Sequence, residues 1–206
     1  MILCNKLPSC NQAFIGRKDE IKAIASHLSN QSVLFITGMA GIGKSEVAKA
    51  YAQKNRKKYT NIIYLYYTGN LRKDIANLTF ADDSVEMNEE VRFQNHYKVM
   101  QRLHTDTLLI LDNFNVLPKD EPFLKELMKN DMQLLITSRC KLKNYDSIEI
   151  KELDKDKELK ELFYKHCPSA KRDPDSVSAI IEEVNCHTLT VCMAALTLEV
   201  SGMEPE

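Results

Sequence analysis

The chain has 206 residues, of which 44% are hydrophobic, and its 28 basic and 29 acidic side chains give a formal net charge of −1. This composition is typical of a folded globular protein and argues against a dedicated nucleic-acid binder, although a local basic patch remains open. The sequence contains no run of about 18 apolar residues, so no membrane span is predicted, and its first residues lack the pattern of a secretory signal. Six cysteines without a Cys-x-x-Cys pair predict reduced thiols in a cytoplasmic protein.

Up to residue 150 the apolar pattern predicts alternating strands and helices. After an irregular lead, buried strands are predicted at 33–36, 62–67, 107–111, 132–137 and, more weakly, 147–150. Helices are predicted at 19–28, 44–58, about 71–78 and 122–129. A further helix is predicted to follow an acidic loop at 81–90 and to end at about residue 103. Strands that alternate with helices indicate βαβ units and a parallel sheet.

Beyond residue 150 the pattern is helical only. Asp173-Pro174 has the form of a helix start, and Thr188 is expected to cap a nearly all-apolar helix at 189–200. The neighbouring His187 is expected to flank that helix in a structural role. We therefore predict three segments, which are a lead at 1–13, an α/β core at 14–150 and a small helical subdomain at 151–206.

Glycine is scarce, with six residues or about 3% against a typical value of about 7%. Three of the six belong to Gly38-Met39-Ala40-Gly41-Ile42-Gly43-Lys44-Ser45, which fits G-x-x-x-x-G-K-[S/T] and lies between a predicted strand and helix. Such glycines let backbone N–H groups approach phosphate oxygens, while the lysine reaches the outer phosphates and the hydroxyl takes a Mg²⁺ position. The residues predicted to contact nucleotide here are Gly38, Met39, Ala40, Gly41, Ile42, Gly43, Lys44, Ser45 and Glu46.

Two later strands end in side chains that suit the same chemistry. The strand at 107–111 ends at Asp112, a candidate Mg²⁺ ligand of the Walker B type, and the alternative is an ordinary strand-end acid. Asn113 follows it, and an amide cannot accept a proton as a general base, although it can orient a water. Arg139 follows another strand and is predicted to sense the γ-phosphate, with a plain surface arginine as the alternative. Together with Lys44, these three residues form the predicted catalytic set.

Four motifs in this order resemble the NB-ARC branch of the STAND signalling ATPases over about residues 12–200. They are Phe14-Ile15-Gly16-Arg17 with Glu20, GMAGIGKS, LLILDN and LLITSR. The resemblance implies a P-loop NTPase fold with strand order 5-1-4-3-2 and a nucleotide between the core and the helices after residue 151. It also implies adenine-side contacts from Phe14, Ile15, Arg17, Leu189 and Thr190, where Thr190 replaces the family's usual proline. Many related hydrolases carry an acid where this chain has Asn113, so slow hydrolysis is expected.

The resemblance further implies how the chain works. We expect a switch that binds ATP or ADP with Mg²⁺, hydrolyses ATP slowly or not at all, and self-associates or engages an effector or sensor protein, without membrane or direct nucleic-acid binding. The family's winged-helix subdomain would follow residue 200, so a truncated or minimal form is expected. One alternative is an interaction module that holds ADP as a structural cofactor. A less favoured one is a turnover P-loop ATPase or a small-molecule kinase, for which no Arg-rich insertion is found.

Overall fold

The structure is a computed structural model that describes residues 7–81, 83–84 and 86–202. Five parallel strands form one sheet in the order β2-β3-β4-β1-β5. These strands are β1 (Val33–Thr37), β2 (Asn61–Tyr66), β3 (Thr107–Asp112), β4 (Gln133–Ser138) and β5 (Ser147–Glu149). The order is the predicted 5-1-4-3-2 read from the other edge, and it confirms that the Arg139 strand lies between the phosphate-loop strand and the Asp112 strand.

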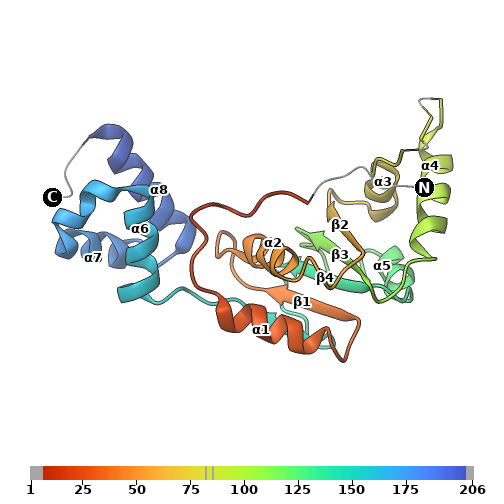
Figure 1. Cartoon of the computed structure of the whole chain (residues 1–206), viewed down its shortest axis with the longest axis horizontal. Coiled ribbons are helices and arrows are strands. Elements are labelled where there is room, and N and C mark those ends of the chain that lie inside the picture. The colour runs from red at the N-terminus through yellow and green to blue at the C-terminus, as the bar shows by residue number, and fades with distance from the viewer. Residues whose placement is uncertain (1–6, 82, 85, 203–206) are drawn as a thin grey trace.

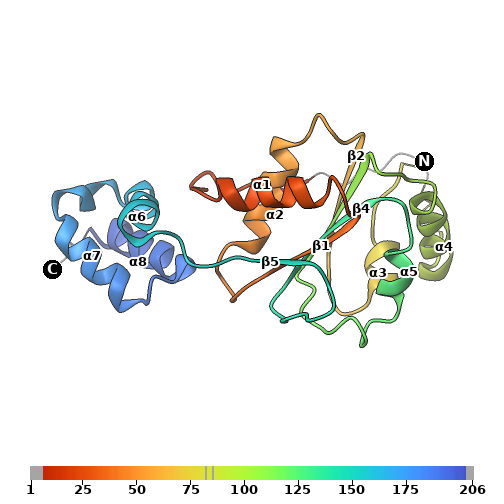
Figure 2. The ribbon, with the colours of Figure 1, turned by 90° about the horizontal axis from the view of Figure 1, so that it is seen from below.

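Helices cover both faces of this sheet (Figures 1 and 2). On one face lie α1 (Lys18–His27) and α2 (Lys44–Lys54), and on the other lie α3 (Leu71–Ala76), α4 (Glu89–Met100) and α5 (Phe123–Leu127). Along β3, Leu108 and Ile110 pack toward the first pair while Leu109 and Leu111 pack toward the second group. Because both faces are covered, β3 and β4 are buried at every position, which explains their uninterrupted apolar sequences.

The residues after β5 form a helical unit with a core of its own. It contains a π-helical turn η1 (Lys155–Leu159), α6 (Lys160–His166), a 3₁₀ turn η2 (Pro168–Arg172), α7 (Pro174–Glu183) and α8 (Thr188–Ser201). Figure 1 shows this unit beside the sheet, with the lead running between the two. From here on the lead means residues 7–17, which precede α1, and its Ala13 and Ile15 are buried in the helical core together with Phe163, Val177 and Val191. The lead therefore joins the two parts by hydrophobic packing.

Helix ends differ from the sequence predictions at three places. The predicted helix at 44–58 ends at Lys54, because Asn55 Nδ2 donates to the Tyr51 carbonyl 2.9 Å away and competes with the helical pattern. The helix expected to reach residue 103 ends at Met100. The prediction that Thr188 caps the last helix is wrong, since the cap is His187, whose ring nitrogen accepts from Thr190 N. The Thr188 hydroxyl is buried without a hydrogen-bond partner.

Asp173 does cap α7, since its carboxylate accepts from Ser176 N at 3.1 Å, as the Asp-Pro pair predicts. Cys4 lies outside the described residues, and the other five cysteines are free thiols. Of these, Cys167 is buried, whereas Cys186 and Cys192 are half-buried. Among the helices of the described residues, none is both long and apolar enough to cross a bilayer.

A buried polar chain fastens α1 and α2 to the sheet. Tyr51 and Tyr59 share a hydrogen bond of 2.6 Å between their hydroxyls, and the Tyr59 hydroxyl donates to Gln133 Oε1 at 2.6 Å. The Gln133 amide then donates to the carbonyl of Leu28, directly after α1. Each of these groups is buried, so the chain of bonds satisfies polar atoms that water does not reach.

Replacing Gln133 by leucine should therefore destabilise the fold. The Gln133→Leu variant leaves the Tyr59 hydroxyl and the Leu28 carbonyl without this partner, and we expect the free energy of unfolding to fall by about 2–3 kcal/mol. Urea denaturation followed by circular dichroism measures the change. The control is Gln101→Leu at the exposed end of α4, which should shift it by less than about 0.5 kcal/mol. Equal shifts in both variants would contradict the role of this network.

Candidate functional site

The phosphate loop leaves β1 at Gly38 and enters α2 at Lys44. Gly38, Gly41 and Gly43 have φ values of 145°, 72° and 105°, a region that favours glycine. A Cβ on Gly38 would lie 2.7 Å from the Ile150 carbonyl oxygen, and one on Gly41 would lie 2.7 Å from the His187 ring. The clustered glycines are therefore required by backbone conformation, and two of them also by close neighbours.

Lys44 is held at the centre of this loop. Its side chain is 9% exposed, and Nζ donates to the Gly38 carbonyl at 3.0 Å and the Met39 carbonyl at 2.6 Å. Burial lowers the pKa of the Lys44 ammonium, nearby Arg139 lowers it further, and Asp112 acts in the opposite direction. The loop thus presents a fixed positive charge beside its own backbone.

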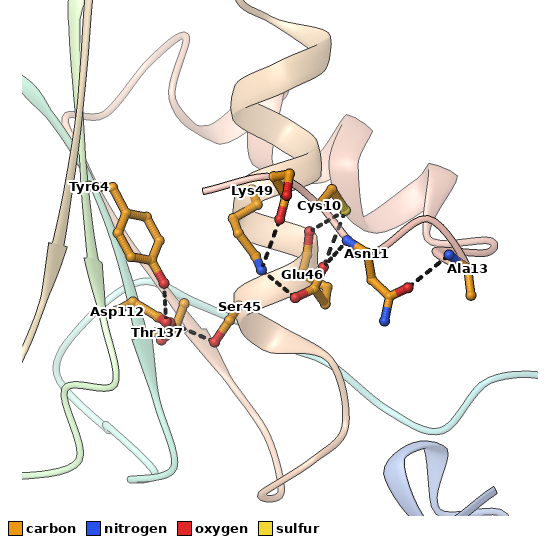
Figure 3. Close-up of polar contacts among 10 residues, drawn as sticks. Cys10, Asn11, Ala13, Ser45, Glu46, Lys49, Tyr64, Asp112 and Thr137 are labelled. Atoms are coloured by element: carbon orange, nitrogen blue, oxygen red, sulfur yellow. Dashed lines mark hydrogen bonds and ion pairs between the residues drawn. The ribbon is translucent and has the colours of Figure 1, made fainter. Parts of the chain in front are cut away.

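The Asp112 carboxylate at the end of β3 is surrounded by hydroxyl groups (Figure 3). It is 3% exposed, and Oδ1 accepts from Ser45 at 2.7 Å and from Thr137, while Oδ2 accepts from Tyr64 at 2.5 Å. Burial raises the pKa of Tyr64, and its bond to Asp112 adds to the rise, so the phenol stays protonated and donates. Three hydroxyls from α2, β4 and β2 therefore fix the orientation of one carboxylate.

This arrangement fits Mg²⁺. The Ser45 hydroxyl and the Asp112 carboxylate are adjacent oxygen ligands, which Mg²⁺ prefers, and the ion usually takes further ligands from water and substrate phosphates. Within the described residues, no group of three or more His, Cys, Asp or Glu side chains is placed to hold a metal. The protein would thus supply two ligands and leave the remaining positions to the substrate.

A hollow of about 240 Å³ opens beside Lys44 and Ser45. Its lining combines the loop with polar residues at the carboxyl ends of β3 and β4, namely Ala40, Gly41, Gly43, Lys44, Ser45, Glu46, Asn113, Asn115, Thr137 and Arg139. The exposed Arg139 side chain belongs to this lining, as the sensor prediction requires. We refer to this space as the phosphate hollow.

Asn113 and Asn115 form a hydrogen-bonded chain along one wall of the phosphate hollow. Asn113 has a positive φ of 65°, its N–H donates to Thr137 Oγ1 at 2.9 Å, and its side-chain oxygen accepts from the Asn115 amide. The Asn115 oxygen in turn accepts from Arg139 N at 3.0 Å. Sequence reasoning missed Asn115, although its place just after β3, at the edge where strand ends converge, was an available signal.

A second hollow of about 230 Å³ lies between the lead, the phosphate loop and the helical unit, and we call it the apolar hollow. Its lining is Asn11, Ala13, Phe14, Ile15, Arg17, Gly41, Ile42, Gly43, Glu46, Leu153, Leu162, Thr188, Leu189 and Cys192. Four of the five predicted adenine-side residues are here, whereas Thr190 is absent because its hydroxyl bonds His187 Nδ1 at 2.8 Å. Met39 lies outside both linings and is 60% exposed.

His187 joins the helical unit to the phosphate loop. Its Nε2 lies 2.7 Å from the Ala40 carbonyl, which requires the ring proton on Nε2 and leaves Nδ1 to accept from Thr190. The ring also lies against Gly41, where a Cβ would collide with it. The residue thus caps α8 and contacts the loop with the same imidazole, a role beyond the helix-flanking one that the sequence predicts.

Arg17 braces the loop from the other side. It is 6% exposed, has a positive φ of 60°, and its guanidinium donates to Glu20 Oε1 at 2.9 Å and to the Ile42 carbonyl at 3.2 Å. The Gly-Arg-x-x-Glu pattern therefore encodes an ion pair that holds the loop backbone. Arg17 also lines the apolar hollow, so it is placed to serve both as a brace and as a wall.

Comparison with known proteins places this geometry in a wider group. No family model matches the chain, and neither does any curated protein. Among solved structures, the Walker-type ATPase Paby2304 of Pyrococcus abyssi aligns with a TM-score of 0.68 and 11% identity over 96% of this chain and 71% of that one. DnaA from Aquifex aeolicus, solved with AMPPCP bound, aligns with a TM-score of 0.57 and 16% identity over 92% of this chain and 63% of that one.

The chain has the P-loop NTPase fold. The parallel sheet with its order β2-β3-β4-β1-β5 and the loop between β1 and α2 are the features that carry this likeness. At these identities the likeness extends to the fold alone. The roles of individual residues of this P-loop fold therefore rest on the geometry described above.

The Arg17 brace makes a prediction about stability. Arg17→Met removes a buried cation and leaves Glu20 and the Ile42 carbonyl without their partner, so we expect a loss of about 2–3 kcal/mol in the free energy of unfolding. Chemical denaturation measures it. The matched control is Lys22→Met on the same helix, whose ion pair with Asp19 is largely exposed and should contribute less than about 1 kcal/mol. A loss for Arg17→Met no larger than that of the control would refute the brace.

Proposed function

We propose that this chain binds ADP or ATP with Mg²⁺ and acts as a STAND-type signalling switch of the NB-ARC branch, with slow or absent hydrolysis. The observation that carries the proposal is that Lys44 and Ser45 line the phosphate hollow while the Ser45 hydroxyl donates to the Asp112 carboxylate. A backbone loop with a buried ammonium attracts phosphate, and the two oxygen ligands beside it suit Mg²⁺. The adjoining apolar hollow offers a base the nonpolar walls that nucleotide sites use.

The contacts of the helical unit support a switch rather than a passive binding site. His187 bonds the Ala40 carbonyl, and the Leu189 Cβ lies 2.9 Å from where a Cβ on Gly41 would be. A ligand that alters the loop therefore acts directly on the first turn of α8. A ligand shifts a conformational equilibrium only if it binds the two arrangements of a packed element with different affinity.

The polar wall of the phosphate hollow supports slow hydrolysis. Asn113 and Asn115 occupy the positions after β3, and neither amide accepts a proton. Glu46 is an acid in the lining, but its carboxylate is engaged by Asn11 N at 2.7 Å and by Lys49. A bound triphosphate would thus be held by cations and amides without a free general base.

The remaining parts of the proposal concern partners and location. We place the protein in the cytoplasm, which agrees with five free thiols in the described residues. The partner would be a second copy of the chain or an effector or sensor protein, and it would bind differently to the two arrangements of the helical unit.

The second candidate function, an interaction module with ADP as a structural cofactor, is favoured by the way the lead, loop and α8 enclose the apolar hollow. Mass spectrometry of any released ligand, with its exchange rate, separates the two.

Removing the Lys44 ammonium should weaken nucleotide binding. We expect Lys44→Ala to lose about 2–4 kcal/mol of binding free energy for ADP and ATP, as when one partner of a buried charged pair is deleted. Isothermal titration calorimetry on folded protein measures it. The control is Lys54→Ala at the exposed end of α2, which should bind as the wild type does. Failure of the wild type to bind either nucleotide, or equal affinity in Lys44→Ala, would disprove the proposed site.

Hydrolysis should respond to the amide that follows β3. We expect steady phosphate release from ATP below about 1 s⁻¹, at the low end of typical turnover numbers. Asn113→Asp keeps the side-chain shape and a residue type that tolerates the positive φ, and it should raise the rate by supplying a carboxylate. A coupled phosphate assay follows release, with Asp112→Asn as the inactive control. Release well above about 1 s⁻¹ by the wild type would favour a turnover ATPase instead.

A further inference from the structure

Glu46 lies in the first turn of α2, directly after Ser45 in the sequence. Figure 3 shows the two side chains on different sides of the helix, with Ser45 toward Asp112 and Glu46 toward the lead. Glu46 lines both the phosphate hollow and the apolar hollow. In a nucleotide the sugar connects the phosphates to the base, so a ligand that fills both hollows brings its sugar past this carboxylate.

Three donors hold the Glu46 carboxylate in place. Oε2 accepts from Asn11 N at 2.7 Å and from the Cys10 thiol at 3.4 Å, while Oε1 is paired with the Lys49 ammonium. Burial, followed by the bond to Glu46, raises the pKa of the Cys10 thiol to about 11, so the thiol remains a donor. Lys49 is 13% exposed, and its ammonium forms an ion pair with the Glu46 carboxylate.

The carboxylate still has accepting capacity toward the hollows. Two carboxylate oxygens offer about four lone-pair positions, and three are used by the donors described above. The Glu46 side chain is 30% exposed, and Glu46 lines both hollows. A pre-positioned anion at such a place favours a ligand that brings hydroxyl groups.

We infer that the Glu46 carboxylate accepts a hydrogen bond from a sugar hydroxyl of the nucleotide and makes the site selective for ribonucleotides. The inference rests on the proposed nucleotide binding and adds a choice of sugar. Hydrogen bonds to an ionised acceptor are stronger than neutral ones. A site that bonds a hydroxyl also discriminates against an analogue that lacks it, because the analogue loses this charge-assisted hydrogen bond. In addition, repulsion between the Glu46 carboxylate and a phosphate group excludes a sugar that carries an additional phosphate.

A purely structural role for Glu46 has a different signature. If its carboxylate served only to anchor Cys10 and Asn11, its loss would loosen one wall of the apolar hollow and weaken every nucleotide to the same degree. A sugar contact instead changes the ratio between the affinities of ribose and deoxyribose ligands. The ratio is therefore the quantity to measure.

The experiment is calorimetric titration of the nucleotide-free full chain with ADP, 2′-deoxy-ADP and 3′-deoxy-ADP. We expect ADP to bind about tenfold more tightly than at least one deoxy analogue, the effect of one charge-assisted hydrogen bond. In Glu46→Ala the ratio should fall to about one, whereas Glu46→Gln, which keeps an acceptor without charge, should give an intermediate ratio. The matched control is Lys49→Met, which removes the ion pair but keeps the carboxylate and should preserve the discrimination.

Each outcome decides the matter. Equal binding of the three ligands by the wild type overturns the inference while the proposed function stands, and this comparison needs no variant to fold. A ratio that persists in Glu46→Ala also overturns it, because the carboxylate would then act only as an anchor. If the wild type binds none of the three ligands, the proposed function fails and the inference fails with it.

Discussion

The rest of the site depends on how the carbonyl groups of the phosphate loop are held. The Lys44 ammonium donates hydrogen bonds to the carbonyls of Gly38 and Met39. Two side chains from distant segments bond later carbonyls of the loop. His187 bonds the carbonyl of Ala40, and Arg17 bonds that of Ile42. No described peptide bond is cis, so the N–H that follows each carbonyl points to the opposite side. The N–H groups of Gly41 and Gly43 thus face away from His187 and Arg17, at residues that line the phosphate hollow.

This constraint joins three segments that are far apart in the sequence. The lead places Ala13 and Ile15 in the helical core and is tied to α2 through Asn11 and Glu46. The helical unit returns to the loop through His187. Because all three segments meet at one short stretch of backbone, a change in the loop reaches both the lead and α8 without a long relay. Such direct contact is a simpler basis for coupling than a pathway through the sheet.

Much of the fold could be predicted from the sequence, since its strongest signals are local. The mostly apolar segments 107–111 and 132–137 indicate strands covered on both faces, and β3 and β4 are buried at every position. The clustered glycines predicted the loop because few backbones require them. Helix ends were less predictable: Asn55 ends α2 through a side-chain bond, and His187 rather than Thr188 caps α8.

The contacts that define the site beyond its motifs depend on tertiary structure. His187 and Ala40 are separated by 147 positions, and Tyr64 and Asp112 by 48, so neither pair leaves a pattern in a single sequence. Asn115 becomes a site residue only because β3 and β4 are neighbours in the sheet. The resemblance placed Thr190 beside the base, yet Thr190 is outside the lining of the apolar hollow and its hydroxyl bonds His187 Nδ1.

The polar groups around the phosphate hollow explain why binding and hydrolysis can be separated in such a site. Asp112 accepts hydrogen bonds from Ser45, Thr137 and Tyr64, so the orientation of its carboxylate is fixed by three hydroxyl groups. In the lining of the phosphate hollow, the hydrogen bonds from Arg139 N to Asn115 and from Asn115 to Asn113 involve only amide groups. Amides and cations bind phosphate oxygens well, but they do not remove a proton from water. The same arrangement that would hold a triphosphate would therefore give little help to its cleavage, in keeping with the switch that we propose.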